Sequence, residues 1–219
     1  MIGSKIKTRN MQVSLFQSKL FLAVETFYLI VFPLLLIYRK PELIHWRLPV
    51  MLAGLIYAFL VMKTNKLSLR KIGLSKTNFL PAVKNLILPT LIGITSLLVG
   101  KFFDSSIWYI KAVVDEVSGK PIFFVLFIYA VISAPLQELI FRGFYLSRLE
   151  LVSRNKTFLI WYSAIVFAII HLPLGNWRIT IASLLMSLVY AGNFLKYQNA
   201  SAISISHAIL GGLMIYLMI

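Results

Sequence analysis

Residues 121–146 read PIFFVLFIYAVISAPLQELIFRGFYL, an apolar run whose only charged side chains are Glu138 and Arg142. A helix needs about 20 predominantly apolar residues to cross a bilayer, and this run is long enough. Within lipid, a helix satisfies all its own backbone hydrogen bonds in one segment. The stretch therefore predicts a transmembrane helix that carries two charges in its second half.

The rest of the chain repeats this pattern. Of its 219 residues, 59% are hydrophobic and 13% are charged, which leaves too little polar surface for a soluble domain. Seven apolar runs with charged ends are candidate spans: 20–38, 48–62, 79–99, 121–146, 158–172, 179–195 and 200–219. Because the fourth run is longer than a bilayer requires, a break there would make eight. We predict an all-α, polytopic transmembrane helical bundle that forms a single membrane domain over residues 1–219, not a β-barrel or a disordered chain.

The charge and cysteine counts exclude several functions. The chain has 22 Lys and Arg against 7 Asp and Glu, a net charge of +15. Most of these cations flank apolar runs, where they contact anionic headgroups, so we expect membrane lipids as partners and no nucleic acid. The absence of cysteine excludes disulfides, thiolate zinc sites and a cysteine nucleophile.

The distribution of the cations predicts an orientation. Alternating the seven runs across the membrane puts 13 Lys and Arg on the side of the basic amino-terminal tail and 7 on the other side. The positive-inside rule then predicts a cytoplasmic amino terminus. We expect the location to be a bacterial plasma membrane.

Charged groups at bilayer depth cost about 2.5 kcal/mol or more each, so they mark candidate functional residues. The predicted spans contain few titratable or amide side chains of this kind: Glu25, Lys84, Gln137, Glu138, Arg142, His171 and His207. Glu25 and Lys84 lie on different spans, where they can pair with each other, or Lys84 can extend to the interface. Glu138 and Arg142 are four residues apart, so they share a helical face and can form an ion pair.

Three of these residues are expected at similar depth. Taking Arg148, Lys156 and Tyr197 as cytoplasmic edges and about 1.5 Å of rise per residue puts Glu138 about 15 Å deep. The same estimate puts His171 at about 22 Å and His207 at about 15 Å. A carboxylate and two imidazoles from three helices can therefore meet in one polar cavity, with Arg142 nearer the cytoplasm.

The order and spacing of these residues resemble the CPBP (Abi) family, which groups type II CAAX prenyl proteases with bacteriocin-processing enzymes. The family pattern is Glu-Glu-x-x-x-Arg, Phe-x-x-x-His and His-x-x-x-Asn or Asp on late helices. The resemblance covers about 121–219 and rests on these residues: Gln137, Glu138, Arg142, Gly143, Phe167, His171, Ser206 and His207. It implies an intramembrane protease with Glu138, His171, His207, Arg142 and Gln137 at its site.

Two positions depart from the family pattern. The first Glu of the pair, which the family uses to activate water, is Gln137, and the Asn or Asp expected four residues after the last His is Gly211. Gln137 has no titratable carboxylate and cannot be a general base. Gly211 lacks the polar side chain expected to hold the site together. Glu138 is then the one carboxylate left for the chemistry.

Two mechanisms fit these residues. In the first, Glu138 is the general base, Arg142 orients it, and His171 and His207 stabilise the oxyanion or position the water, with no cofactor. In the second, Glu138, His171 and His207 bind Zn²⁺ as two histidines and a carboxylate. The second uses the sole acid as a ligand, and the chain has no His-Glu-x-x-His helix, so we rank it lower.

The predicted function is hydrolysis of a peptide bond in a membrane-tethered protein or peptide. The alternative is a catalytically impaired member of the family, suggested by Gln137 and Gly211, that acts as a membrane scaffold, regulator or immunity-type protein. A transporter ranks third, because it would leave the cluster of histidines and glutamate unexplained.

Overall fold

The structure is a computed structural model that describes residues 18–65 and 68–219, and within these residues every regular element is a helix. Six helical segments of this part are long and apolar enough to cross a membrane: Lys19–Arg39, Phe79–Phe103, Ile122–Val152, Lys156–Leu174, Trp177–Tyr197 and Ala200–Met218. A shorter apolar helix, Leu48–Lys63, corresponds to the remaining predicted run. The prediction of an all-α polytopic bundle is confirmed.

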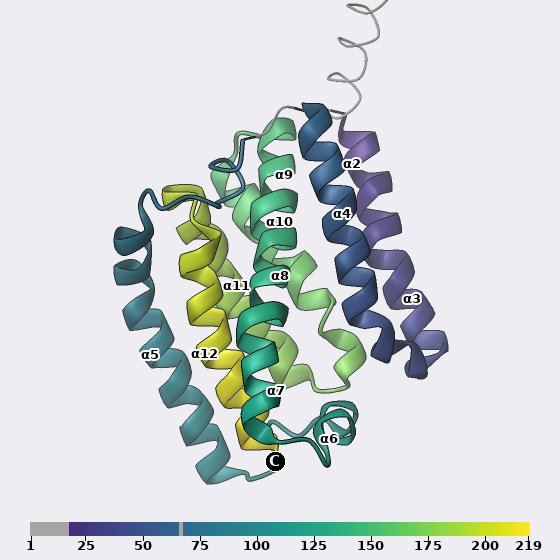
Figure 1. Ribbon diagram of the computed structural model, residues 1–219, viewed down its shortest axis with the longest axis vertical. Coiled ribbons are helices and arrows are strands. Elements are labelled where there is room, and N and C mark those ends of the chain that lie inside the picture. Colours follow the sequence, from purple (N-terminus) through teal and green to yellow (C-terminus); the bar gives the residue numbers. More distant parts are fainter. Residues whose placement is uncertain (1–17, 66–67) are drawn as a thin grey trace, which may run out of the picture.

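The amino-terminal span and the short apolar helix form a hairpin at one edge of the bundle (Figure 1). The span consists of α2 (Lys19–Thr26), the π-helical turn η1 (Phe27–Val31) and α3 (Phe32–Arg39). The 3₁₀ turn η2 (Pro41–Trp46) then leads back into α4 (Arg47–Asn65). A connection this short makes the two helices antiparallel neighbours.

The fourth span is one continuous helix, so the break that would have made an eighth span does not occur. It consists of α7 (Ile122–Ile128), η3 (Tyr129–Ser133), α8 (Ala134–Glu138), η4 (Leu139–Leu146) and α9 (Ser147–Val152). The elements η3 and η4 are π-helical, and they enclose the single α-helical turn that ends at Glu138. Wide turns of this kind are frequent at functional sites because they change the direction of side chains within a helix.

The carboxy-terminal part adds three long helices beside the fourth span. They are α10 (Lys156–Ile169), which leads into the 3₁₀ turn η5 (Leu172–Leu174), α11 (Trp177–Tyr197) and α12 (Ala200–Met218). Each begins directly after an asparagine whose side chain accepts a hydrogen bond from a backbone N–H of the first turn, the N-cap arrangement. These caps are Asn155, Asn176 and Asn199.

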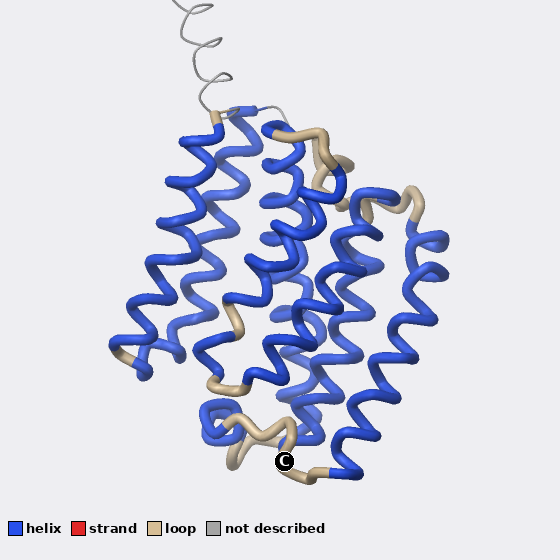
Figure 2. Tube along the Cα trace, turned by 180° about the vertical axis from the view of Figure 1, so that it is seen from behind, coloured by secondary structure: helices blue, strands red, loops and turns tan. Residues whose placement is uncertain are grey.

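Helices α10 and α11 pack against each other, and α12 packs between α8 and α5 (Phe79–Phe103), which forms the other edge of the bundle (Figure 1). A short helix, α6 (Lys111–Val117), lies near the carboxy terminus and is too short to span. The helices run roughly side by side in the view from behind as well (Figure 2). This arrangement brings α8, α10, α11 and α12 around one region of the interior.

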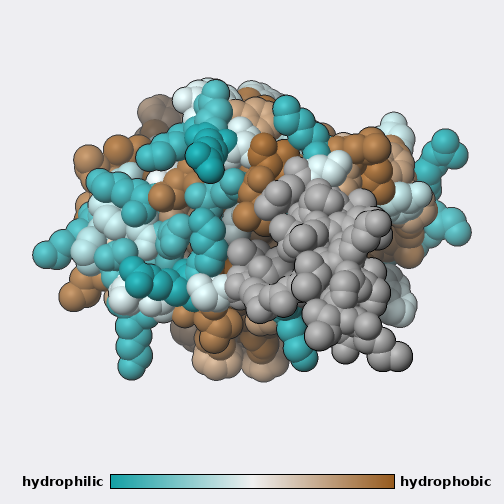
Figure 3. Space-filling model, turned by 90° about the horizontal axis from the view of Figure 1, so that it is seen from above, coloured by the Kyte–Doolittle hydropathy of each residue, from teal (hydrophilic) through white to brown (hydrophobic). Residues whose placement is uncertain are grey.

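The described chain begins at one end of the bundle and finishes at the other (Figure 1). Seen from above the end where it begins, hydrophilic side chains gather on the surface (Figure 3). This is the end that the cation count predicts to be cytoplasmic. The tail cations Lys5, Lys7 and Arg9, which contribute to that count, lie outside the described residues.

The predicted pair of Glu25 and Lys84 is wrong. Glu25 is buried, accepts a hydrogen bond from the Tyr57 hydroxyl at 2.6 Å, and lies 3.4 Å from Nη2 of Arg148. Lys84 is exposed on α5, as the alternative of an extended lysine requires. Arg148, which we expected at the cytoplasmic edge, is fully buried, and its helix continues past it to Val152. The ion pair joins the amino-terminal span to the fourth span.

Candidate functional site

Glu138 lies at the centre of a buried polar cluster. It ends α8, has no exposed surface, and accepts a 2.6 Å hydrogen bond on Oε1 from Nδ1 of His207. Its Oε2 lies 3.2 Å from Nε of Arg142, whose Nη1 also lies 3.4 Å from Oε1. Both carboxylate oxygens are therefore engaged by cationic or imidazole nitrogens.

Arg142 forms the predicted ion pair with Glu138 and has further partners on two other helices. It is fully buried on η4, and its Nη2 donates to the Ser187 hydroxyl on α11 at 2.6 Å. Its guanidinium carbon lies 4.2 Å from the centroid of the Phe167 ring, in cation–π contact. The side chain is thus held by α10 and α11, and it balances the charge of Glu138 in the interior.

The His207 ring is enclosed by aromatic side chains. The Phe167 and Tyr129 rings approach it edge-on, with centroids at 5.8 and 6.1 Å, and the Tyr190 ring stacks beside it at 6.1 Å. Because a carboxylate only accepts, the bond to Glu138 requires the hydrogen on Nδ1 of His207. In the neutral ring, Nε2 then keeps its lone pair.

His171 joins the cluster through Phe167 rather than through Glu138. Its ring packs on Phe167 at 4.9 Å between centroids, and its Nδ1 lies 2.9 Å from the Phe167 backbone oxygen. A carbonyl oxygen only accepts, so this contact also requires the hydrogen on Nδ1 and leaves Nε2 as an acceptor in the neutral ring. Of the three side chains expected to meet, Glu138 and His207 are in direct contact, and His171 is separated from His207 by the ring of Phe167.

Gln137 makes its hydrogen bond within its own helix. The amide nitrogen donates to the Ser133 hydroxyl at 3.2 Å, and the residue is half-buried. It is adjacent to Glu138 in sequence but takes no part in the bonds of Glu138, Arg142 and His207. Since an amide does not titrate, this position contributes a donor and an acceptor but no base.

The structure adds polar residues that the sequence reasoning did not select. Ser187 and Tyr190 lie three residues apart on α11; Ser187 bonds Arg142, and the Tyr190 hydroxyl lies 3.0 Å from that of Ser206. Ser206, next to His207, is also 2.6 Å from the Thr90 hydroxyl of α5. The available signal was their three-residue spacing, which puts two polar side chains near one face of an apolar helix.

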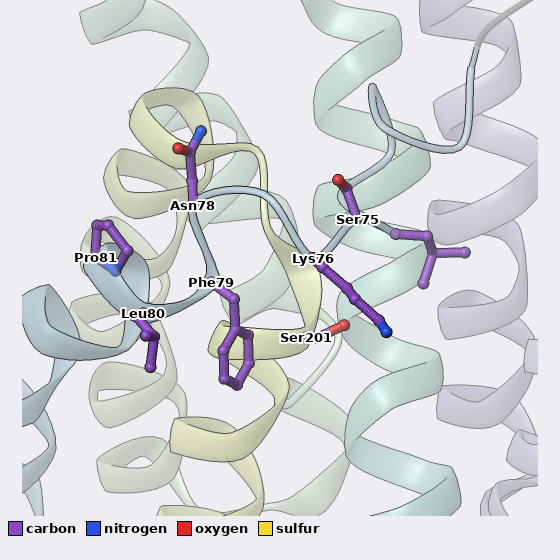
Figure 4. Close-up of a pocket in the computed structure, with 8 residues that line it drawn as sticks. Ser75, Lys76, Asn78, Phe79, Leu80, Pro81 and Ser201 are labelled. Atoms are coloured by element: carbon purple, nitrogen blue, oxygen red, sulfur yellow. The ribbon is translucent and has the colours of Figure 1, made fainter.

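Two surface cavities lie outside this cluster. The larger, of about 830 Å³, is lined by the loop before α5, by the first residues of α5 and by Ser201 (Figure 4). The second, of about 410 Å³, follows the seam between α8 and α12, where Pro135 and Leu139 flank Glu138 in sequence and Ala208 follows His207. Its lining is mostly apolar and includes the exposed Ile205 and Ile209. The second cavity is therefore the one adjacent to the helices that carry the site.

The described residues contain no group of three His, Asp or Glu side chains that could hold a metal ion. Nδ1 of His207 already faces Glu138, and His171 faces a backbone oxygen with the same atom. Both contacts leave Nε2 of each ring as an acceptor, and metal-binding histidines commonly donate their other ring N–H to a carboxylate or a backbone oxygen in this way. Zinc held by Glu138, His171 and His207 therefore stays the alternative prediction.

Comparison with known proteins supports the resemblance expected from the sequence. Residues 119–213 match the family model described as type II CAAX prenyl endopeptidase Rce1-like. None of the curated proteins and none of the solved structures compared matches the chain. The match runs from α7 into α12, which it covers as far as residue 213, and includes every residue of the cluster described above except Thr90. Over residues 119–213, the chain is similar to the Rce1-like type II CAAX prenyl endopeptidases, the group that the sequence resembles.

Proposed function

We propose that this protein is an intramembrane endopeptidase that hydrolyses a peptide bond near the membrane-tethered end of a protein or peptide. The observation that carries the proposal is the 2.6 Å hydrogen bond between His207 and Glu138, in an interior where Arg142 balances the carboxylate. A histidine oriented by a buried carboxylate is a general base in many hydrolases. The family match supports a protease of the CAAX type.

Glu138 activates water through His207 rather than by direct contact. Its side chain has no exposed surface, and its Oε1 already accepts the hydrogen bond from His207, while Oε2 makes no hydrogen bond and lies 3.2 Å from Nε of Arg142. The carboxylate instead keeps the hydrogen of His207 on Nδ1, which makes Nε2 the atom that accepts a proton. Glu138 then stabilises the imidazolium that forms.

The reaction proceeds in two steps. The oxygen of a water molecule attacks the carbon of the scissile carbonyl while one proton of that water moves to Nε2 of His207. The same proton passes to the amide nitrogen as the carbon–nitrogen bond breaks, which releases a carboxylic acid and an amine; the acid then gives its proton to water or to the amine. Nε2 of His171 orients the water by accepting its second hydrogen, a role that the bond to the Phe167 oxygen allows.

The cavity along α8 and α12 provides the route for the substrate. Its apolar lining, with Ile205 and Ile209 exposed, suits the apolar anchor of a tethered substrate. It lies along α8 and α12, the helices that carry Glu138 and His207, whose own side chains are buried behind its lining. The cation count favours a cytoplasmic amino terminus, and the location proposed is a bacterial plasma membrane. The proposed steps use only the side chains of this cluster, because Glu138 is already the partner of His207 and Arg142.

The test uses the purified protein in liposomes with two probes, a peptide that ends in a prenylated CAAX sequence and a peptide with a plain acyl anchor. Products are identified by mass spectrometry. The wild-type chain should cleave at least one probe. His207→Gln should lower the rate by about 100-fold or more while the protein stays folded, since it removes the base. Glu138→Gln should lower the rate as much, but it also leaves the buried Arg142 without its anion, which costs about 3–5 kcal/mol, so its thermal unfolding is measured alongside.

The matched control is Asp115→Asn, which removes an exposed carboxylate that pairs with Lys111 far from the cluster. Its rate should equal that of the wild type. Equal cleavage by Glu138→Gln and wild type would contradict the mechanism. A wild-type chain that cleaves neither probe would favour the scaffold alternative, in which a membrane partner co-purifies with the wild type and with both variants alike.

A further inference from the structure

Gly211 lies inside α12, where its backbone is helical and does not need a glycine. The glycines with left-handed backbone in the described residues are Gly73, Gly119 and Gly175. A glycine within a helix weakens it relative to alanine, because it has more freedom to lose on folding. A glycine here is explained if a neighbouring side chain occupies the space that a side chain at position 211 would need.

That neighbour is Tyr129, the first residue of the π-helical turn η3. A β-carbon added to Gly211 would overlap the Tyr129 hydroxyl and lie 2.5 Å from Cζ and 2.7 Å from Cε1 of the same ring. The clash involves the end of a side chain that is itself packed between helices, so any larger residue at 211 displaces the phenol. The Tyr129 hydroxyl thus packs directly against Gly211, in the space that a side chain at this position would fill.

The same ring also contacts the site. Its centroid lies 6.1 Å from that of His207, with the planes at 72°, the edge-to-face geometry that aromatic pairs prefer. His207 precedes Gly211 by four residues, so one phenol covers both positions on the same face of α12. Tyr129 therefore supports the imidazole from the side of Gly211, while Glu138 holds its Nδ1.

We propose that Tyr129, packed against Gly211, is a positioning residue for His207. Its hydroxyl supplies the polar group that the glycine at position 211 lacks. The expected changes in kcat rest on the proposed function, whereas the contacts of Tyr129 with Gly211 and His207 do not. The sequence pattern leads one to expect Asn or Asp at 211, and a phenol from another helix turn now occupies that space. The glycine at position 211 and the phenol of Tyr129 therefore compensate for each other, and the site keeps a polar group there.

The kinetic test compares three variants on the peptide probe that the wild type cleaves. Gly211→Ala should lower kcat by about 100-fold, because displacing the phenol releases the imidazole from its productive orientation. Tyr129→Phe keeps the ring and removes the hydroxyl, so kcat should fall by about tenfold with KM unchanged, the effect of one hydrogen bond. The double variant Tyr129→Ala with Gly211→Asn should be faster than Tyr129→Ala alone, since the amide then supplies the missing polar group.

A second readout does not depend on cleavage. The chain has three histidines, so ¹⁵N-histidine labelling gives three sets of ring signals. Substituting each histidine in turn assigns them. Gly211→Ala should shift the His207 signals, and Tyr129→Phe should change them less. Tyr216→Phe is the matched control, because Tyr216 is exposed on the same helix α12 and should leave all signals and kcat as in the wild type.

The outcomes separate the two proposals. If the wild type cleaves no probe, the proposed function fails, and the His207 signals of Gly211→Ala alone decide whether Tyr129 positions the ring. If the wild type cleaves, and both Gly211→Ala and Tyr129→Phe match it in kcat and in their His207 signals, the positioning role is overturned while the protease stands. Loss of folding in Gly211→Ala, seen by thermal unfolding, leaves Tyr129→Phe and the double variant to decide.

Discussion

Nη2 of Arg142 donates to the hydroxyl of Ser187 at 2.6 Å, so α11 holds the cation that balances Glu138. The two residues are 45 positions apart, and both are fully buried. The carboxylate of Glu138 thus depends on a helix that supplies neither of the histidines.

Replacing Arg142 by Gln should strongly destabilise the protein. The change leaves the buried carboxylate of Glu138 without its cation, which costs about 3–5 kcal/mol. Ser187→Ala removes one hydrogen bond to a charged donor and should cost about 1.5–3 kcal/mol. Unfolding in detergent, followed by circular dichroism, measures both. Equal stability of Arg142→Gln and Ser187→Ala would mean that the ion pair contributes little.

Replacing His171 by Gln should slow cleavage without unfolding the protein. The amide can still bond the Phe167 oxygen, but the ring contact with Phe167 and the acceptor Nε2 are lost. We expect kcat/KM to fall by about 100-fold, a typical effect of losing a group that positions or activates water. His45→Gln, which lies outside the six spans, is the control. Unchanged kinetics in His171→Gln would remove His171 from the mechanism.

The ion pair of Glu25 and Arg148 should couple the amino-terminal span to the Rce1-like segment. A double-mutant cycle with Glu25→Gln and Arg148→Gln is expected to give a coupling energy of about 1–3 kcal/mol, because both side chains are buried. Tyr57→Phe removes one hydrogen bond to Glu25 and should cost about 1.5–3 kcal/mol. Additive effects of the two ionic substitutions would show that the contact has no energetic weight.

Restoring a carboxylate at position 137 should change turnover little. Gln137 donates to Ser133 and lies outside the bonds of Glu138, so the natural chain does not depend on a base there. We expect Gln137→Glu to stay within about threefold of the wild type in kcat. A gain of 100-fold or more would mean that the natural chain is impaired by Gln137, as the scaffold alternative holds.

Chelation should leave cleavage unchanged. The described residues offer no group of three His, Asp or Glu side chains for a metal ion. Elemental analysis of the purified protein should find no stoichiometric zinc, and EDTA should not alter the rate. One zinc per chain, lost together with activity on chelation and in His207→Gln, would restore the metal mechanism.

Hydropathy was sufficient to predict the helices, because a segment that crosses lipid must be apolar over its own length. All seven predicted runs are helical, and the fourth extends to Val152. The pair of Glu138 and Arg142 was predictable for a similar reason, since residues four apart share one face of a helix. The estimated depth along separate helices put His207 level with Glu138, but depth alone does not determine which side chains are in contact.

The amino-acid sequence by itself therefore determined that this is a polytopic helical membrane protein, and it singled out Glu138, Arg142, His171 and His207 as candidate site residues. The tertiary structure alone decided that Glu25 pairs with Arg148, that Ser187 holds Arg142, and that Tyr129 fills the space over Gly211. The physical reason is that hydropathy and helical spacing act within one segment. Which faces of different helices meet depends on how all of them pack together.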